Sequence, residues 1–236
     1  MLPLRRFFSI HHQSYLPGII LFVLAVVVGL CVYQDYGIGW DEPLQREMGM
    51  VSYNYVFEGD TTLRSYIDRD HGVGVELPLV MLEKGLGLED KREVFLMRHV
   101  AGHLFFLVGA FCAYVLATRL FANQWMGIAA FMMVWLHPRL YGHSFVNTKD
   151  VPLMVMFIVS MLVAHIAFGR GRWPWMLAMG MAVGFATSIR VLGVVLFAGF
   201  LLFLLVDMVA AMGQKTGEGK AVMNVLCFVA GSCGCI

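Results

Sequence analysis

Gly39-Trp40-Asp41-Glu42-Pro43 is the stretch that decides how this chain folds. It lies near the start of a long polar segment, from Asp35 to Arg92, in a chain that is otherwise apolar enough for a membrane. The segment follows the first apolar run, and its acidic pair stands between a Trp and a Pro. We therefore expect the remaining helices to hold this loop and a shorter polar loop, from His137 to Asp150, over one site at the membrane surface.

Composition places the chain among polytopic membrane proteins. It has 236 residues, of which 59% are hydrophobic and 14% are charged. Soluble domains typically contain about 45–50% apolar and about 25% charged residues. One water-soluble core cannot bury such an excess of apolar side chains. The formal net charge of +1 gives no indication of nucleic-acid binding.

Apolar runs of about 17–25 residues predict membrane-spanning helices. We expect seven of them, at roughly 16–34, 94–118, 125–138, 152–168, 173–189, 191–210 and 221–236. The third is short because Pro138 disfavours helix continuation. The seventh reaches Ile236 without a polar flank, which leads us to expect a C-terminal truncation of a longer protein. The predicted fold class is an all-α polytopic membrane protein with interfacial helices in its first outer loop.

Basic residues in the short connections predict the orientation. They fall on one side of the membrane if the helices alternate, and they are Arg5, Arg6, Arg119, Arg170, Arg172, Lys215 and Lys220. Lys and Arg accumulate in cytoplasmic loops, so this side is expected to be cytoplasmic. The outer loops are then about 35–92 and about 137–151, together with the turn near Arg190.

The first outer loop is expected to contain helices of its own. Apolar side chains recur there at the spacing of one helix face, at Leu44, Met48, Val51 and Tyr55. This pattern predicts a helix over 43–57, and a second apolar-rich stretch covers 77–88. Both stretches are too short to cross a bilayer, so we expect helices that lie in the interface.

Asp41 and Glu42 are the first candidates for chemistry. Adjacent residues on a helix do not face each other, so one carboxylate can face the site while the other faces the loop. A carboxylate that is partly desolvated between helices has a raised pKa, which suits a general base. Asp41 also fits the N-cap of the helix that follows. The residues alone leave both roles open.

The second outer loop carries more functional side chains than a plain connection needs. They are Arg139, His143, Asn147, Lys149 and Asp150. Lys149 and Arg139 are able to bind a phosphate through charge and hydrogen bonds. Asp150 is alternatively the cap of the helix that begins before Pro152.

Arg190 stands between two long apolar runs, which indicates a functional site by default. The alternative is an arginine that snorkels to the interface. His71 precedes Gly72 and Gly74, and such glycines let the backbone approach a ligand or a neighbouring helix closely.

Two other classes of protein compete with an enzyme of this kind. His99 and His103 share a helix face at a spacing that can hold a metal, so a metal-dependent membrane enzyme that uses outer histidines is one alternative. A transporter fragment is the other, and it predicts charges near the middle of the membrane and broken helices. Here the charges lie mainly at helix ends and in outer loops, which counts against a transporter.

Together these motifs resemble the membrane glycosyltransferases of the C-type superfamily, especially the dolichyl-phosphate-mannose–protein mannosyltransferase branch. The resemblance rests on the Asp41-Glu42 pair, the segment from His71 to Pro78, Asn147-Thr-Lys-Asp150-Val-Pro152 and Thr187-Ser-Ile-Arg190-Val-Leu-Gly193. The resemblance extends over residues 1–236, which we interpret as one glycosyltransferase-like transmembrane module. It consists of a pattern of short motifs.

The resemblance implies transfer of a sugar from a polyprenyl-phosphate donor to an acceptor outside the cytoplasm, by inverting single displacement. The expected location is the plasma or inner membrane, and the acceptor is a protein, a lipid or a glycan. The implied catalytic residues are Asp41, Glu42 and Asp150. The implied phosphate-binding residues are Arg190, Lys149 and Arg139. The implied site-lining residues are His71, His143 and Asn147. The donor is a substrate and no cofactor is certain, while a divalent metal stays an open alternative that these residues do not support.

Overall fold

The computed structural model describes residues 15–69, 72–212 and 218–234. Every regular element of these residues is a helix. Four helical segments are long and apolar enough to cross a membrane: Leu16–Asp35, Lys91–Phe121, Asp150–Arg170 and Val191–Val209. Shorter apolar helices cover Gln124–Trp135, Trp173–Ile189 and Ala221–Cys233. The expected all-α membrane architecture is confirmed.

Each of the seven expected spans coincides with a helix. They are α1 (Leu16–Val32), α4 (Lys91–Phe121), α5 (Gln124–Trp135), α7 (Asp150–Arg170), α8 (Trp173–Ile189), α9 (Val194–Met212) and α10 (Glu218–Cys233). At 1.5 Å per residue α5 is about 18 Å long, whereas the hydrocarbon core is about 30 Å thick. For α5 and the other short helices a complete crossing stays a prediction.

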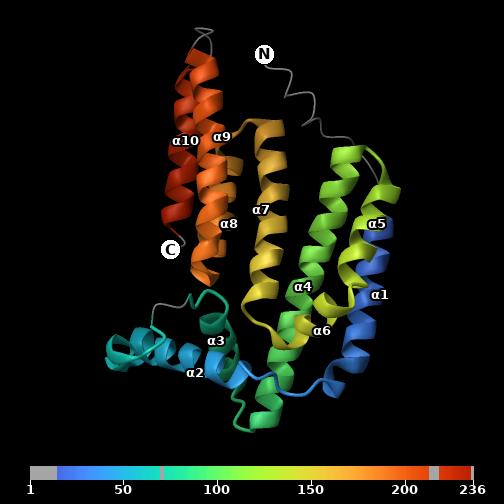
Figure 1. The fold of residues 1–236 in the computed structure, drawn as a ribbon, viewed down its shortest axis with the longest axis vertical. Helices are drawn as coiled ribbons and strands as arrows, with labels where there is room; N and C mark the ends of the chain where they lie inside the picture. Colours follow the sequence, from blue (N-terminus) through green and yellow to red (C-terminus); the bar gives the residue numbers. More distant parts are fainter. Residues whose placement is uncertain (1–14, 70–71, 213–217, 235–236) are drawn as a thin grey trace.

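These helices run alternately in opposite directions, so their connections gather at two ends (Figure 1). The upper end in Figure 1 holds the α4–α5 and α7–α8 connections, whose helices end with Arg119 and Arg170 in their last turns. Arg119 Nε donates to the Tyr15 hydroxyl at 3.0 Å, which places the start of α1 beside the end of α4. The lower end holds α2, α3 and α6.

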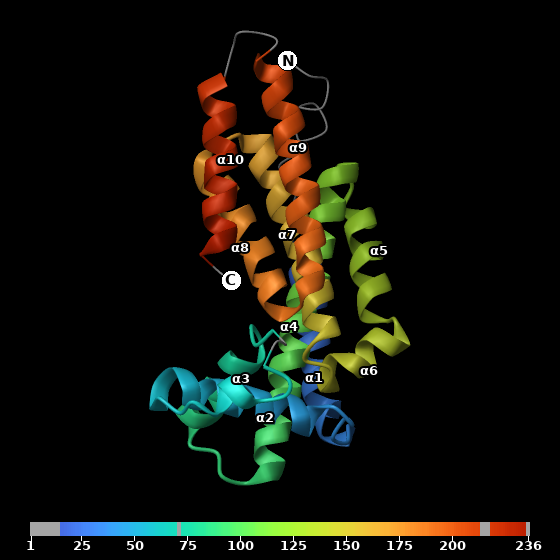
Figure 2. The same cartoon turned by 60° about the vertical axis from the view of Figure 1, so that its left-hand side comes forward.

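The segment between α1 and α4 folds as a helical layer against the lower end of the bundle (Figure 2). α2 (Glu42–Tyr53) continues as the π-helical η3 (Asn54–Glu58), and α3 covers Glu76–Leu86. Gly59 and Gly87 end these stretches at φ +71° and +64°, in the left-handed conformation that glycine adopts without strain. The described residues also contain three 3-10 turns: η2 (Tyr33–Asp35), η4 (Thr62–Ser65) and η5 (Val191–Gly193). The two helices expected in this segment are confirmed.

The apolar residues that predicted α2 are only partly covered by the protein: Met48 is buried and Val51 is partly buried. Leu44 and Tyr55, both on the predicted face, are 46% and 38% exposed. Besides Met48, the buried residues of α2 are polar or small, and they are Glu42, Gln45, Gly49 and Ser52. The covering surface explains this difference, because α4 presents buried arginine and histidine side chains to the layer.

The connection between α5 and α7 contains a helix where we expected a loop. Residues Pro138–Val146 form α6, with His137 as its N-cap. His137 Nδ1 accepts a hydrogen bond from the backbone N–H of Leu140 at 3.3 Å. Pro138 occupies the first turn, where its missing N–H is not needed. His137-Pro138 therefore begins a new helix after ending the previous one.

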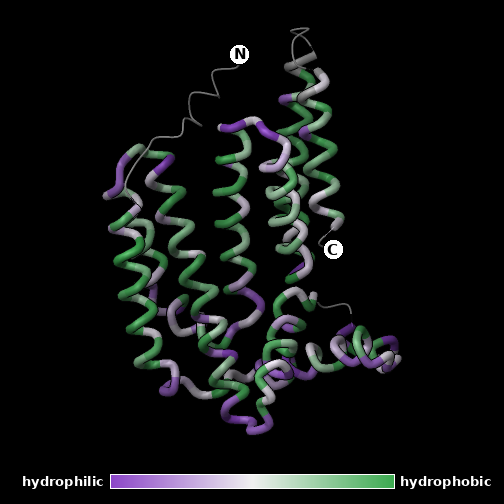
Figure 3. Tube along the Cα trace, turned by 180° about the vertical axis from the view of Figure 1, so that it is seen from behind, coloured by the Kyte–Doolittle hydropathy of each residue, from purple (hydrophilic) through white to green (hydrophobic). Residues whose placement is uncertain are grey.

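Two apolar clusters hold the bundle together. One cluster joins α7, α8, α9 and α10 around Met179 and Phe228. The other joins α1, α4 and α5 around Phe106 and Phe131. Figure 3 shows hydrophobic residues along the upright helices and hydrophilic residues at their connections. Many large apolar side chains of α1 and α9 are exposed, as lipid-facing helices require.

α4 carries both the bundle and the helical layer. Its 31 residues span about 46 Å, which exceeds the roughly 30 Å hydrocarbon core by several turns. The lower part of α4 passes beside α2 and α3 (Figures 1 and 2). Arg98, His99 and His103 are buried along this part of the helix.

Candidate active site

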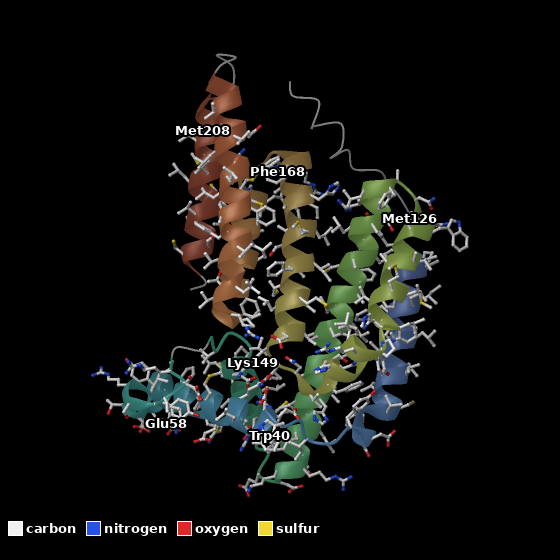
Figure 4. The ribbon with its side chains drawn as sticks, in the orientation of Figure 1. Trp40, Glu58, Met126, Lys149, Phe168 and Met208 are labelled. Atoms are coloured by element: carbon white, nitrogen blue, oxygen red, sulfur yellow. The ribbon has the colours of Figure 1, made fainter. Side chains whose placement is uncertain are left out.

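The two polar segments predicted to share a site lie side by side. A Cβ placed on Gly39 would lie 3.2 Å from Cβ of Val146, so the turn that carries the acidic pair packs on the end of α6. Figure 4 shows Trp40 and Lys149 at the same end of the molecule. The structure therefore brings the beginning of α2 next to the connection between α6 and α7.

Glu42 is the first residue of α2, and its side chain is fully buried. Its Oε2 accepts a hydrogen bond of 2.6 Å from the backbone N–H of Gly39. His99 Nε2 lies 3.3 Å from both carboxylate oxygens of Glu42. The carboxylate thus closes the turn in front of α2 and ties this turn to α4.

Asp41 lies at the N-cap position of α2, but its side chain makes no capping hydrogen bond. Its carboxylate is exposed, and it has no hydrogen-bond or ion-pair partner among the residues that the structure describes. The neighbouring Trp40 is 98% exposed. The Asp41 side chain therefore does not act as a helix cap, and its carboxylate is accessible to a ligand.

A second buried network lies under α3. Glu76, the first residue of α3, accepts a hydrogen bond from Nη2 of the fully buried Arg98. The Thr148 hydroxyl lies within hydrogen-bonding distance of Glu76 Oε1 and of the Gln45 side-chain amide. The hydroxyl has one proton, which we assign to the carboxylate, so the amide turns its NH2 group toward Thr148 Oγ1. This network joins α2, α3 and α4 to the α6–α7 connection.

Asp150 and Arg190 form an ion pair at the lower ends of α7 and α8. Their side chains are 62% and 48% exposed. Asn147 supports this site, because its Oδ1 accepts from the backbone N–H groups of Lys149 at 3.1 Å and Asp150 at 2.7 Å. Asn147 thus binds the backbone where α7 begins, whereas Lys149 occupies the N-cap position and Asp150 is the first helical residue.

Comparison with known protein families identifies the family of this chain. Residues 91–231 match the sequence model of the dolichyl-phosphate-mannose-protein mannosyltransferases. The chain belongs to this family. No curated protein and no solved structure matches it. The matched range begins at the first residue of α4, so α2 and α3 lie ahead of it. The resemblance inferred from short motifs is thereby confirmed, and the protein is a membrane glycosyltransferase of the mannosyltransferase type.

The other predicted binding residues of this mannosyltransferase-family protein differ in position. Lys149 is partly buried between Thr148 and Asp150, and its ammonium group has no ion-pair partner in the described part of the chain. Arg139 and His143 are exposed on α6, on the N-terminal side of this segment. His71 lies outside the described residues.

The two histidines considered for a metal site face different partners. His99 faces Glu42, whereas His103 Nδ1 lies 2.7 Å from Oγ of Ser144. The His103 ring also stacks on Phe145, with centroids 4.2 Å apart. Within residues 15–69, 72–212 and 218–234, no group of three or more His, Cys, Asp or Glu side chains is arranged to hold a metal ion. The geometry gives the metalloenzyme alternative no support here, and metal analysis of the purified protein would test it.

The glycines after His71 approach a neighbouring helix, as their positions predicted. Gly74 N–H donates to the Ser188 carbonyl at 3.0 Å. A Cβ on Gly72 would lie 2.2 Å from the same carbonyl oxygen and 2.5 Å from that of Ile189. This close packing brings the chain before α3 to the end of α8, one residue ahead of Arg190.

A further ion pair joins α2 and α3 at a separate position in the layer. Arg46 Nε and Nη2 donate to the Glu83 carboxylate at 3.0 and 2.5 Å. The hydrogen bond with Glu83 raises the pKa of Arg46 above its ordinary value. This pair stabilises the layer without contacting the networks around Glu42 and Glu76.

Sequence reasoning missed Gln45, Glu76, Arg98 and Thr148. Arg98 did carry a signal, because an arginine inside a long apolar helix indicates a functional site by default. We applied this rule to Arg190 alone. Glu76 and Thr148 gave no such signal, since their pairing depends on how three helices meet.

Proposed function

We propose that this protein transfers a sugar from a polyprenyl-phosphate donor to an acceptor on the extracytoplasmic side of the plasma or inner membrane. The acceptor is a protein, a lipid or a glycan, and the reaction inverts the anomeric configuration in a single displacement. Membership of the mannosyltransferase family supports sugar transfer. The finer assignments rest on the arrangement of charges around the beginning of α2.

The observation that carries the proposal is the exposed carboxylate of Asp41. It belongs to the turn that packs on Val146 at the end of α6, and no capping bond engages it. Glu42, by contrast, is buried and bound to Gly39 and His99. In the proposed mechanism Asp41 is therefore the general base, and Glu42 shapes the turn that presents it.

The cations near this turn suit the phosphate of a lipid-linked donor. Lys149 supplies an unpaired charge within the described residues, and Arg190 supplies a planar guanidinium that Asp150 orients. Arg139 is a third, more peripheral cation on α6. His143 and Asn147 flank this region, and Asn147 acts through the backbone that it binds. The same proposal assigns His71 to the donor side.

The distribution of basic residues supports the assigned side. Arg119, Arg170 and Arg172 belong to the connections at the end of the bundle opposite α2 and α3. Cytoplasmic loops are the ones enriched in Lys and Arg. The end with Asp41 is accordingly assigned to the outer face.

The proposed reaction balances without a covalent enzyme intermediate. The acceptor hydroxyl oxygen attacks the anomeric carbon of the sugar while Asp41 takes the hydroxyl proton. The bond between that carbon and the phosphate oxygen breaks, and its electron pair leaves with the polyprenyl phosphate. Arg190 and Lys149 stabilise the negative charge that develops on the leaving phosphate.

An Asp41→Asn substitution tests the base. Transfer of radiolabelled mannose from mannosyl-phosphoryl-polyprenol to membrane acceptors is expected to fall by about 10²–10⁴-fold, the usual contribution of a general base. Binding of polyprenyl phosphate should stay at the wild-type level. Asp35→Asn is a matched control, because Asp35 is another exposed aspartate of the same segment. Full transfer by Asp41→Asn would refute the assigned role.

A further inference from the structure

Two consecutive residues of α4 make polar contacts with the first residues of α2 and α3. His99 faces Glu42 at the start of α2, and Arg98 faces Glu76 at the start of α3. Consecutive side chains on a helix point about 100° apart, so neighbours on α4 can reach two different helices. All four residues are at most 1% exposed.

Each of these contacts leads to a different part of the proposed site. His99 contacts Glu42, and Glu42 Oε2 accepts a hydrogen bond of 2.6 Å from the Gly39 N–H. Gly39 belongs to the turn that presents Asp41. From Arg98 the contact passes through Glu76 to the Thr148 hydroxyl, which precedes Lys149 and Asp150.

We propose that Arg98 and His99 are positioning residues that fix two parts of the active site. His99 sets the orientation of Asp41 through Glu42. Arg98 sets the position of the Asn147–Asp150 segment through Glu76 and Thr148. This inference rests on the proposed function for the roles of Asp41 and of the cations. It adds that the two contacts control different kinetic steps.

Packing of the layer alone does not require these contacts. α2 and α3 already pack closely, since a Cβ on Gly49 would lie 2.9 Å from Val80 Cγ2. The Arg46–Glu83 ion pair joins the same two helices. Met48, Leu79 and Val80 supply buried apolar surface. The networks of Glu42 and Glu76 add contacts to the two segments that carry the proposed catalytic and phosphate-binding groups.

Substitutions at His99 test the first contact. In His99→Gln, the side-chain amide nitrogen can take the position of His99 Nε2, which faces Glu42. In His99→Asn, the shorter side chain can place its amide nitrogen only at the position of His99 Nδ1. His99→Asn is expected to lower kcat on the order of a hundredfold through misplacement of the base. His99→Gln should retain most of kcat. Neither should change the affinity for polyprenyl phosphate. In His99→Asn, amide hydrogen exchange over residues 36–44 should accelerate.

Substitutions at Thr148 test the second contact. Thr148→Val keeps the shape of the side chain and removes the hydroxyl, whereas Thr148→Ser keeps the hydroxyl. Thr148→Val should weaken binding of polyprenyl phosphate and raise the donor KM about tenfold, as expected for one lost hydrogen bond. Thr148→Ser should bind like the wild type. Neither change should accelerate exchange over residues 36–44.

Glu83→Gln is the matched control, because it weakens a polar contact between the same helices away from the site. It should leave kcat, KM and polyprenyl-phosphate binding unchanged. Equal kcat in His99→Asn and His99→Gln, or equal binding in Thr148→Val and Thr148→Ser, would overturn the inference. The proposed function fails separately, if Asp41→Asn transfers normally or the wild-type protein does not bind polyprenyl phosphate.

Discussion

The guanidinium of Arg190 pairs with the carboxylate of Asp150, so the C-cap of α8 is joined to the first residue of α7. Both side chains are about half exposed, and such surface pairs typically contribute no more than about 1 kcal/mol to stability. The pair therefore matters less for folding than for where it holds the guanidinium. It keeps a cation next to the segment that contains Lys149.

Replacing Arg190 with Gln tests whether its charge contributes to donor binding more than to the stability of the fold. Arg190→Gln should raise the donor KM by about 10–100-fold, because charge-assisted hydrogen bonds to phosphate contribute about 1.5–3 kcal/mol. The unfolding temperature should change little. Arg172→Gln is the control, since Arg172 is the exposed N-cap at the opposite end of α8. An equal rise in KM for both variants would contradict a local phosphate contact.

Loss of the buried partner of Arg98 should affect stability far more. Glu76→Gln leaves a fully buried guanidinium without its counter-charge, which typically costs about 3–5 kcal/mol. We expect a clear fall in the unfolding temperature of the detergent-solubilised protein. Asp150→Asn breaks an exposed ion pair instead and should lower this temperature only slightly. If the two variants melted alike, the network under α3 would not be the strong contact that its burial indicates.

A pair of glycine substitutions tests the close approach of the chain to α8. A Cβ on Gly72 would overlap the Ser188 and Ile189 carbonyl oxygens, so Gly72→Ala should destabilise the protein and displace the chain before α3. Gly85 lies within α3, and a Cβ there meets nothing within 4 Å. Gly85→Ala should stabilise the helix by roughly 0.5–1 kcal/mol. Thermal unfolding of both variants measures the contrast, and destabilisation by Gly85→Ala would be inconsistent with the structure.

Hydrophobic periodicity predicted the helices well but not every surface on which they pack. Long apolar runs located all seven bundle helices, and the spacing of Leu44, Met48, Val51 and Tyr55 located α2. The spacing did not predict that polar residues of α2 are buried, because the surface that covers α2 includes His99 and the polar Thr148. A pattern within one helix carries no information about the polarity of its neighbour.

The candidate site was predictable in location and only partly in detail. Charges in the two polar loops and in the turn near Arg190 predicted Asp41, Glu42, Asp150 and Arg190 as site residues, and the structure places the two loops together. Which carboxylate of the acidic pair is buried was not predictable, because it depends on a hydrogen bond to Gly39 and on a histidine 57 positions away. The helix α6 was missed because His137-Pro138 ends one helix and begins another.

The length of α4 has a consequence for how the protein responds to different membranes. Helices adapt to thicker or thinner bilayers mainly by changing their tilt. The anchors for the Asp41 turn and for the Asn147–Asp150 segment are adjacent residues on this one rigid helix. A change in tilt therefore moves both segments together and preserves their spacing. Bilayer thickness should then alter how deeply the donor lipid tail must sit to reach the site, and leave the chemical step unchanged.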